Sequence, residues 1–228
     1  MNEFKLIDTY LKPLSKKNIG SLNLSDDIYY DAATRIAISV DTYVEKIHFL
    51  NSNDPDKFLK RIFRSSLSDL ICKGIKPESY FLSLAINKKQ ANKYWFIKLK
   101  NILKKEQNKF NITLAGGDTT KSEKLVITFV VLGKPMKKPV FRSTAKFNDD
   151  IYVTGDLGNS FIGLNILKKI NNFKNFNKFY IKKFYEPDLQ VKLLPFLHSI
   201  ANASIDISDG LLQDLKHLCD NSKCSATV

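Results

Sequence analysis

The sequence predicts an α+β fold, an α/β sandwich followed by a second and smaller region. Three observations lead to this prediction. Runs rich in β-branched residues alternate with segments of helical apolar spacing. A Pro- and Lys-rich break, GKPMKKP, interrupts the pattern at 133–139. The chain has 228 residues, of which 43% are hydrophobic and 26% charged, enough for one large globular domain or two small ones.

The first part, residues 1–137, contains most of the strand signals. Pro55 stands near the start of a segment with helical spacing, and 124–133 (KLVITFVVLG) has the clearest strand composition. The expected strands are 33–40, 79–86, 112–115 and 124–133, and the expected helices are 55–73 and 89–106.

The second part, residues 138–228, shows weaker signals. The expected strands are 150–155 and 204–207, and the expected helices are 159–170, 187–201 and 211–220. The final Ala-Thr-Val has the composition of a strand that is just beginning. We therefore expect an N-terminal domain over 1–137 and an incomplete C-terminal domain over 138–228.

The formal net charge of +13 indicates an anionic partner, which nucleic acid, a membrane surface or a phosphorylated substrate could each provide. Only four of the 36 basic residues are Arg, the residue that nucleic-acid readers prefer for its bidentate fork. We interpret the Lys-rich stretch 168–184 as solvated surface.

Other classes have little support in the sequence. The first residues lack the apolar core of a signal peptide, and no run approaches the length of a membrane span. Three cysteines without metal-ligand spacing predict free thiols in a reducing cytoplasm. Three histidines leave little material for a zinc site or a His-based triad. Neither GxxxxGK[ST] nor GxGxxG occurs, so the common phosphate loops are absent.

Aspartate is the informative residue, with 17 Asp against six Glu. Seven of the aspartates stand beside small or hydroxyl residues next to apolar elements: Asp26, Asp27, Asp41, Asp69, Asp118, Asp206 and Asp209. Carboxylates that converge there would suit Mg²⁺ and a polyphosphate. Such a cluster repels itself, so it requires cations.

Each segment also has a structural interpretation. Ser208 and Asp209 could cap the last helix, and the turn chemistry of 116–119 could simply join two strands. Asp69 lies within an apolar helix, where an unpaired carboxylate is costly, although a partnered Asp at a helix end would be acceptable. The coincidence of several weak signals favours the metal site.

The order of motifs resembles the thiamine-monophosphate kinases of the aminoimidazole ribonucleotide synthetase-like superfamily. The motifs are SDD, SVDTYVEKIHF, SLSDLICKGIKP, AGGDTT, RSTAKFNDDIYVTGDLGNS and IDISDGLLQDL. The resemblance implies a PurM-like two-domain fold, transfer of the γ-phosphate of ATP to thiamine monophosphate with several Mg²⁺ ions, and a homodimer whose N-terminal domains pair. Because family members continue beyond ISDG, it also implies an incomplete second domain.

The resemblance carries roles to individual residues. It implies Mg²⁺ ligands at Asp27, Ser39, Val40 (through its carbonyl), Asp41, Asp69, Asp118, Asp206 and Asp209. It implies nucleotide contacts at Gly117, Arg142 and Ser208, and a substrate contact at His48. No acid or base is implied, because phosphoryl transfer depends mainly on positioning and charge neutralisation.

Three alternatives stay open at this stage. The chain could be another ATP-dependent enzyme of the superfamily, such as a selenophosphate synthetase or an aminoimidazole ribonucleotide synthetase. The absence of Cys before Cys72 argues against the former. A nucleic-acid-binding module would explain the charge but not the aspartates. An inactive fragment could bind nucleotide without turnover.

Overall fold

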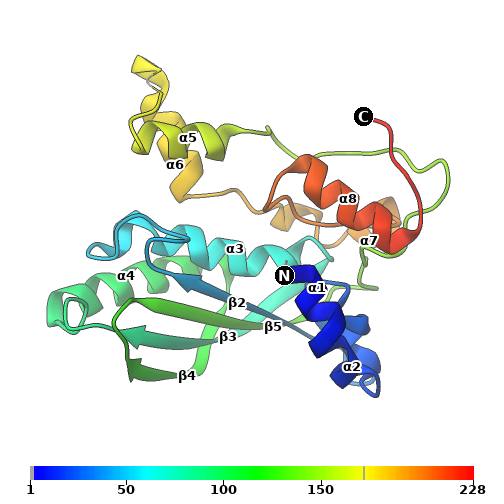
Figure 1. Ribbon diagram of the computed structural model, residues 1–228, viewed down its shortest axis with the longest axis horizontal. Helices are drawn as coiled ribbons and strands as arrows, with labels where there is room; N and C mark the ends of the chain where they lie inside the picture. Colours follow the sequence, from blue (N-terminus) through cyan, green and yellow to red (C-terminus); the bar gives the residue numbers. More distant parts are fainter. Residues whose placement is uncertain (1–2, 172) are drawn as a thin grey trace.

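A single mixed sheet forms the centre of the computed structural model, which describes residues 3–171 and 173–228. Helices α3 and α4 cover one face of this sheet, and the C-terminal helices lie beyond them (Figure 1). The strand order is β1-β2-β5-β3-β4, with only β3 and β4 parallel. The strands are β1 (Tyr29–Asp31), β2 (Ile36–Val44), β3 (Ile75–Ile86), β4 (Thr113–Lys121) and β5 (Val126–Pro135). The α+β prediction is confirmed.

The main core lies between the sheet and α3 (Leu59–Ile71). Apolar residues at helical spacing on α3 meet alternate residues of the strands. Phe63 packs edge-on against Tyr80 and Phe129, with ring centroids 5.1 and 5.5 Å away. Among the described residues, the buried members of this core lie between Ile28 and Val131, with Leu194 as the one exception.

Helix α4 (Lys93–Phe110) packs on α3 and is delimited by local chemistry. The Asn92 side chain accepts the Trp95 N–H, and Asn111 ends the helix in the left-handed conformation. Arg64 of α3 donates two hydrogen bonds, of 2.7 and 3.1 Å, to the Glu106 carboxylate of α4. Both side chains are buried, so this ion pair fixes one helix against the other.

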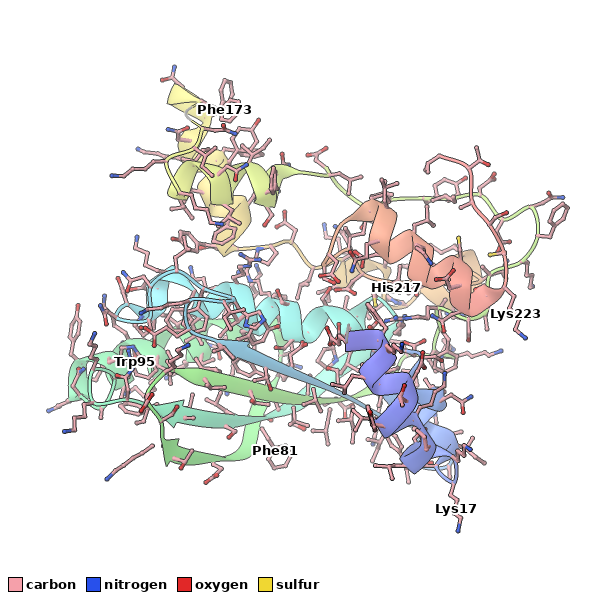
Figure 2. The ribbon with its side chains drawn as sticks, viewed as in Figure 1. Lys17, Phe81, Trp95, Phe173, His217 and Lys223 are labelled. Atoms are coloured by element: carbon pink, nitrogen blue, oxygen red, sulfur yellow. The ribbon has the colours of Figure 1, made fainter. Side chains whose placement is uncertain are left out.

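No helix of the described residues covers the opposite face of the sheet (Figure 1). Apolar side chains are consequently open there: Val40 of β2 is 61% exposed and Phe81 of β3 is 41% exposed. Figure 2 shows Phe81 pointing away from α3 and α4. We call this the outer face of the sheet.

Short helices precede β1, where the sequence analysis predicted no element. They are α1 (Glu3–Leu6), a π-helical segment (Ile7–Leu11), α2 (Lys12–Ser15) and a 3₁₀ segment (Ile19–Leu24). Phe4 of α1 packs on His217, with ring centroids 4.8 Å apart, so α1 contacts the C-terminal region. Figure 2 shows His217 next to α1.

The C-terminal region is helical among the described residues. Its elements are α5 (Asn159–Leu167), 3₁₀ turns at Lys174–Phe176 and Val191–Leu193, α6 (Asn177–Tyr185), α7 (Leu197–Ile200) and α8 (Leu211–Ser222). The predictions of helices at 159–170 and 211–220 are confirmed. The single helix predicted over 187–201 is wrong, because Pro195 separates a short turn from the four-residue α7. The interpretation of 168–184 as surface missed α6, which buries Phe184 against Arg61 of α3.

The strands predicted at 150–155, 204–207 and 226–228 are not formed. A strand requires a hydrogen-bonded neighbour, and no described segment pairs with these residues. Over the described ranges, none of the helices is long and apolar enough to cross a bilayer.

Candidate functional site

Three aspartates from distant parts of the chain meet where the N-terminal and C-terminal regions touch. Asp27, Asp69 and Asp206 each present a carboxylate oxygen, and these oxygens all lie within 4.8 Å of one another. Asp27 precedes β1, Asp69 is on the last turns of α3, and Asp206 lies outside any helix or strand, before α8. We call these residues the aspartate triad.

Asp41 adds a fourth carboxylate beside the triad. Alternation along β2 turns Ser39, Asp41 and Tyr43 toward α3. The Tyr43 hydroxyl donates to Asp41 Oδ2 at 3.3 Å, and it accepts from Ser66 Oγ of α3 at 3.3 Å. Strand β2 and helix α3 therefore bring their carboxylates to a shared position.

Burial and mutual repulsion dominate the electrostatics of this cluster. Burial raises the pKa of Asp69 well above its usual range, and the negative charges of Asp41 and Asp206 raise it further. Burial likewise raises the pKa values of Asp41 and Asp206, while a hydrogen bond from Ser68 opposes the rise at Asp206. Carboxylates that are held together at this cost are typical of functional sites.

Two cations lie against the acidic cluster. The Arg142 guanidinium contacts Asp27, and the Arg142 backbone N–H donates to Asp26 Oδ2 at 3.0 Å. The Lys73 ammonium lies 3.2 Å from Asp26 Oδ1 and 3.9 Å from Asp27 Oδ2. Asp26 and Asp27 therefore both lie against protein cations, whereas no ion pair joins Asp69, Asp206 or Asp41 to a cation among the described residues.

The loop before α8 is organised by an aspartate within the helix itself. Asp214 is buried, and its Oδ2 accepts the backbone N–H groups of Ser208, Asp209 and Gly210 at 3.0, 3.1 and 3.1 Å. The N-cap residue is Gly210, which makes no side-chain cap. The predicted alternative, in which Ser208 or Asp209 caps this helix, is therefore wrong.

His48 lies at the far end of β2 from the triad, next to Tyr43. Its Nδ1 accepts the Val44 N–H at 2.9 Å, and its ring packs edge-on to Tyr43 at 5.8 Å. Because Nδ1 accepts, the neutral imidazole carries its proton on Nε2. The side chain is exposed, and it lies close enough to Asp41 for its positive form to favour the ionised carboxylate.

Gly117 and Asp118 lie on β4, the edge strand, and not in a turn. Asp118 is paired with Ser83, which shares the outer face with Phe81. Three strand steps separate β4 from β2, about 14 Å at about 4.8 Å each. Within one chain, Asp118 therefore lies across the sheet from the triad.

Gly117 has a packing reason of its own. A Cβ there would stand 1.8 Å from the Leu82 carbonyl oxygen. Only glycine allows β4 to approach β3 so closely.

The remaining predicted residues border the site in different ways. Ser39 is buried and donates to the Ser66 carbonyl at 3.3 Å, whereas the Val40 side chain is on the outer face. Asp209 is exposed and accepts from Gln213 at 3.1 Å, and Ser208 is exposed beside it. Their proposed roles as ligands and contacts stay predictions.

Sequence reasoning grouped Asp26 with the candidate carboxylates without an individual role, and it did not single out Lys73, Tyr43 or Asp214. Lys73 follows Asp69 by four residues, a spacing that places an acid and a base on one helical face. Asp214 stands in the first turn after the Ser-Asp-Gly turn, where acids bind free N–H groups. Tyr43 had no comparable signal, because its role depends on how β2 and α3 pack together.

The donor set fits a divalent metal. Carboxylate oxygens from three separate segments, with hydroxyl groups nearby, are the hard ligands that Mg²⁺ accepts. Bound metal charge would oppose the burial, and at Asp69 also the repulsion, that raise the pKa values of Asp69 and Asp206. The arrangement has the ligand chemistry that a divalent ion requires, at the junction of the two regions.

Comparison with known proteins agrees with this chemistry. Residues 25–134 match the model of the AIR synthase related protein, N-terminal domain. The thiamine-monophosphate kinase of Buchnera aphidicola from Acyrthosiphon pisum is 38% identical over 99% of this chain and 71% of its own length. The Haemophilus influenzae enzyme of the same name is 33% identical over 100% of this chain and 70% of its length.

A solved structure described as AaThiL complexed with AMPPCP and TMP superposes on this fold with a TM-score of 0.87. It is 28% identical, and the match covers 97% of this chain and 70% of that one. The sequence identity to thiamine-monophosphate kinases and the match in fold to a solved structure point to the same family. The chain therefore belongs to the thiamine-monophosphate kinase family.

Proposed function

We propose that the chain transfers the γ-phosphoryl group of ATP to the phosphate of thiamine monophosphate, which yields thiamine diphosphate and ADP. The observation that carries this proposal is the aspartate triad, whose three oxygens lie within 4.8 Å of one another at the junction of the two regions. Membership in the family supplies the two substrates.

The residues match the demands of in-line phosphoryl transfer. The acceptor is a phosphate oxygen that is already ionised at neutral pH, so no strong general base is required. Asp27, Asp41, Asp69 and Asp206 would hold Mg²⁺, which when bound neutralises the charge of the phosphate oxygens. Arg142, next to Asp27, offers a fork suited to a nucleotide phosphate.

The surroundings of the triad suggest where each substrate binds. Ser208 is held at the N-terminal end of α8 through Asp214, which supports a nucleotide contact there. His48 offers its Nε2–H from the opposite end of β2, which supports a contact with thiamine monophosphate. Asp209 and Ser39 would supply further ligands to the Mg²⁺ held by the acidic cluster.

We further propose a homodimer in which the outer faces of two sheets pair. The exposed apolar residues Val40 and Phe81 support this arrangement, because a second copy would bury them. It would also account for Asp118, Gly117 and the Val40 carbonyl, which lie on or near this face. In this proposal, Asp118 of one copy lies in the interface and faces the sheet of the other copy.

The proposal includes a division near residue 137: residues 1–137 form the N-terminal ATP- and Mg²⁺-binding and dimerisation domain, and residues 138–228 form the C-terminal domain, which adds Asp206, Arg142 and Ser208 to the site. The unpaired state of Cys72, Cys219 and Cys224 supports a reducing compartment, the cytoplasm.

The function is tested by incubation of the protein with ATP, Mg²⁺ and thiamine monophosphate and by chromatographic detection of thiamine diphosphate. Asp69→Asn should lower turnover by at least about a hundredfold. It removes a ligand of the Mg²⁺ whose charge would stabilise the transition state. Exposed Asp8→Asn, which loses only a surface pair with Lys12, serves as the matched control. Absence of product from the wild-type chain and from a longer version that extends past Val228 would contradict the proposal.

The dimer is tested by sedimentation. Phe81→Glu should shift the wild-type dimer to a monomer, because it places charge in an apolar interface. Tyr94→Glu, at a more exposed aromatic residue on α4, should leave the dimer intact. A wild-type monomer at all concentrations would contradict this part of the proposal.

A further inference from the structure

Lys73 is an unusual residue to find at a metal site, because its side chain is fully buried. Its ammonium donates to the Ser204 carbonyl at 2.7 Å and lies 3.2 Å from Asp26 Oδ1 and 3.9 Å from Asp27 Oδ2. A buried ammonium is stable only when it is paired and hydrogen-bonded, and these three oxygens satisfy that requirement.

The partner of Lys73 is buried as well. The Asp26 side chain is 3% exposed, and its oxygens also accept the backbone N–H groups of Asp27 and Arg142 at 2.9 and 3.0 Å. Asp26 is therefore saturated by protein donors. Asp27 is more open, at 29% exposed, and it is the member of the acidic pair whose oxygen joins the triad.

The charge of Lys73 acts on the whole cluster. It lies close enough to oppose the effect of burial on Asp69 and Asp206, and it follows the end of α3, where a cation is favoured by the helix dipole. Five carboxylates gather here, and Lys73 and Arg142 are the cations in ion-pair contact with them among the described residues. Of these two cations, only Lys73 lacks any exposure to solvent.

Lys73 also joins the two regions of the chain. The Ser204 hydroxyl donates to the Cys72 carbonyl at 2.5 Å, next to the bond from Lys73 to the Ser204 carbonyl. Asp206 follows Ser204 by two residues. The pair of bonds therefore fixes the segment that brings Asp206 to Asp69.

We propose that Lys73 is a permanent internal cation of the metal site, which occupies the Asp26 side of the cluster in place of a divalent ion and keeps the triad assembled before metal binds. This inference rests on the proposed role of the triad as the Mg²⁺ site. Lys73 is a positioning residue: it sets the position and the net charge of the carboxylates and touches no substrate. Its positive charge limits the affinity of the triad for divalent ions.

The test compares Lys73→Met, which removes the charge and keeps an unbranched side chain one atom shorter, with Lys76→Met at an exposed position nearby. Melting temperatures are measured in EDTA and in Mn²⁺, and Mn²⁺ binding is followed by electron paramagnetic resonance. Lys73→Met should melt at a lower temperature in EDTA, show a larger rise on addition of Mn²⁺ than wild type, and bind Mn²⁺ at least about tenfold more tightly, since a like charge is gone. Lys76→Met should match wild type in all three measurements.

A purely structural role for Lys73 predicts a different outcome. In that case Lys73→Met melts at a lower temperature by the same amount with and without Mn²⁺, and its affinity for Mn²⁺ is unchanged or weaker. Either result would overturn the inference. Lys73→Arg, which restores the charge, should return the Mn²⁺ affinity toward the wild-type value.

If Lys73→Met does not fold in EDTA, the comparison moves to the Asp26→Asn background. There the Asp26→Asn/Lys73→Met double variant removes both charges of the pair, and it should bind Mn²⁺ at least about tenfold more tightly than Asp26→Asn alone. Equal affinities would overturn the inference. A wild-type chain that binds no Mn²⁺ would overturn the metal site itself, whereas normal Mn²⁺ binding that is insensitive to Lys73 would overturn this inference alone.

Discussion

The N-terminal sheet region and the helical C-terminal region differ in how they are held together. Between Ile28 and Val131 the chain buries a continuous set of aromatic and aliphatic side chains. Among the described residues of 138–228, the buried hydrophobic residues are Val140, Phe184, Leu194 and Cys219. Large apolar side chains such as Phe147, Tyr152 and Leu212 are more than two thirds exposed there.

This difference shows what positions the candidate site. The first region folds around its own core, and the second docks on it through polar contacts such as the bonds from Lys60 to Glu186 and from Lys73 to Ser204. Asp206 belongs to the second region, and the other triad members belong to the first. The geometry of the triad therefore depends on a docking that contributes little to the stability of the core.

The largest expected effect tests the contrast in packing. Phe129→Ala should lower the free energy of unfolding by about 3–5 kcal/mol, because it leaves a cavity beneath α3. Phe147→Ala, at a residue that is 92% exposed in the second region, should change the free energy by less than about 0.5 kcal/mol. Urea denaturation followed by circular dichroism measures both. Comparable losses in the two variants would show that the second region has a core of its own.

A smaller effect is expected at the loop before α8. Asp214→Ala leaves three backbone N–H groups without their acceptor, and it should lower the stability by about 1–3 kcal/mol and raise the KM for ATP. Asp220→Ala on the same helix loses only an exposed pair with Lys216, so it should change the stability by less than about 0.5 kcal/mol. Thermal melts and ATP titrations of the two variants would separate a positioning role from a general effect on α8. An unchanged KM in Asp214→Ala would remove Asp214 from the nucleotide site.

The smallest effect is a dependence on pH. Burial raises the pKa of Asp69 above that of the unfolded chain, so its protonated form stabilises the fold at low pH and this contribution is lost as the pH rises through the raised pKa. Asp69→Asn should therefore stabilise the metal-free protein relative to wild type, and more so at pH 8 than at pH 5. Urea denaturation in EDTA at the two pH values measures the difference, with Asp8→Asn as the exposed control. If the stabilisation of Asp69→Asn relative to wild type became smaller as the pH rises, the electrostatic interpretation of the cluster would be contradicted.

Local patterns predicted the regular elements of the first region. The β-branched run at 124–133 corresponds to β5, and the helical spacing of 55–73 corresponds to a short turn followed by α3. Patterns failed where an element requires a distant partner. The segment 204–207 has strand composition but no neighbouring strand. Helix α6 buries Phe184 against Arg61 of α3, a contact that the local sequence does not predict.

The candidate site divides in the same way. The sequence pointed to Asp27, Asp69 and Asp206 through the residues around them, and the fold brings these three together. It grouped Asp118 with them equally, although alternation along β4 turns Asp118 to the other face of the sheet. A motif indicates which residues have functional chemistry. It does not indicate whether a strand residue faces a distant helix or the opposite side of the sheet.

The sequence by itself determined the fold class, the family and the identity of the acidic residues, because these follow from composition, periodicity and motif order. Tertiary structure alone decided that Lys73 is buried among the carboxylates, that Asp214 holds the loop before α8, and that Asp118 faces away from the triad. The physical reason is that charge pairing and burial depend on distances between segments up to 180 residues apart, from Asp26 to Asp206. Such distances are set only when the second region docks on the first.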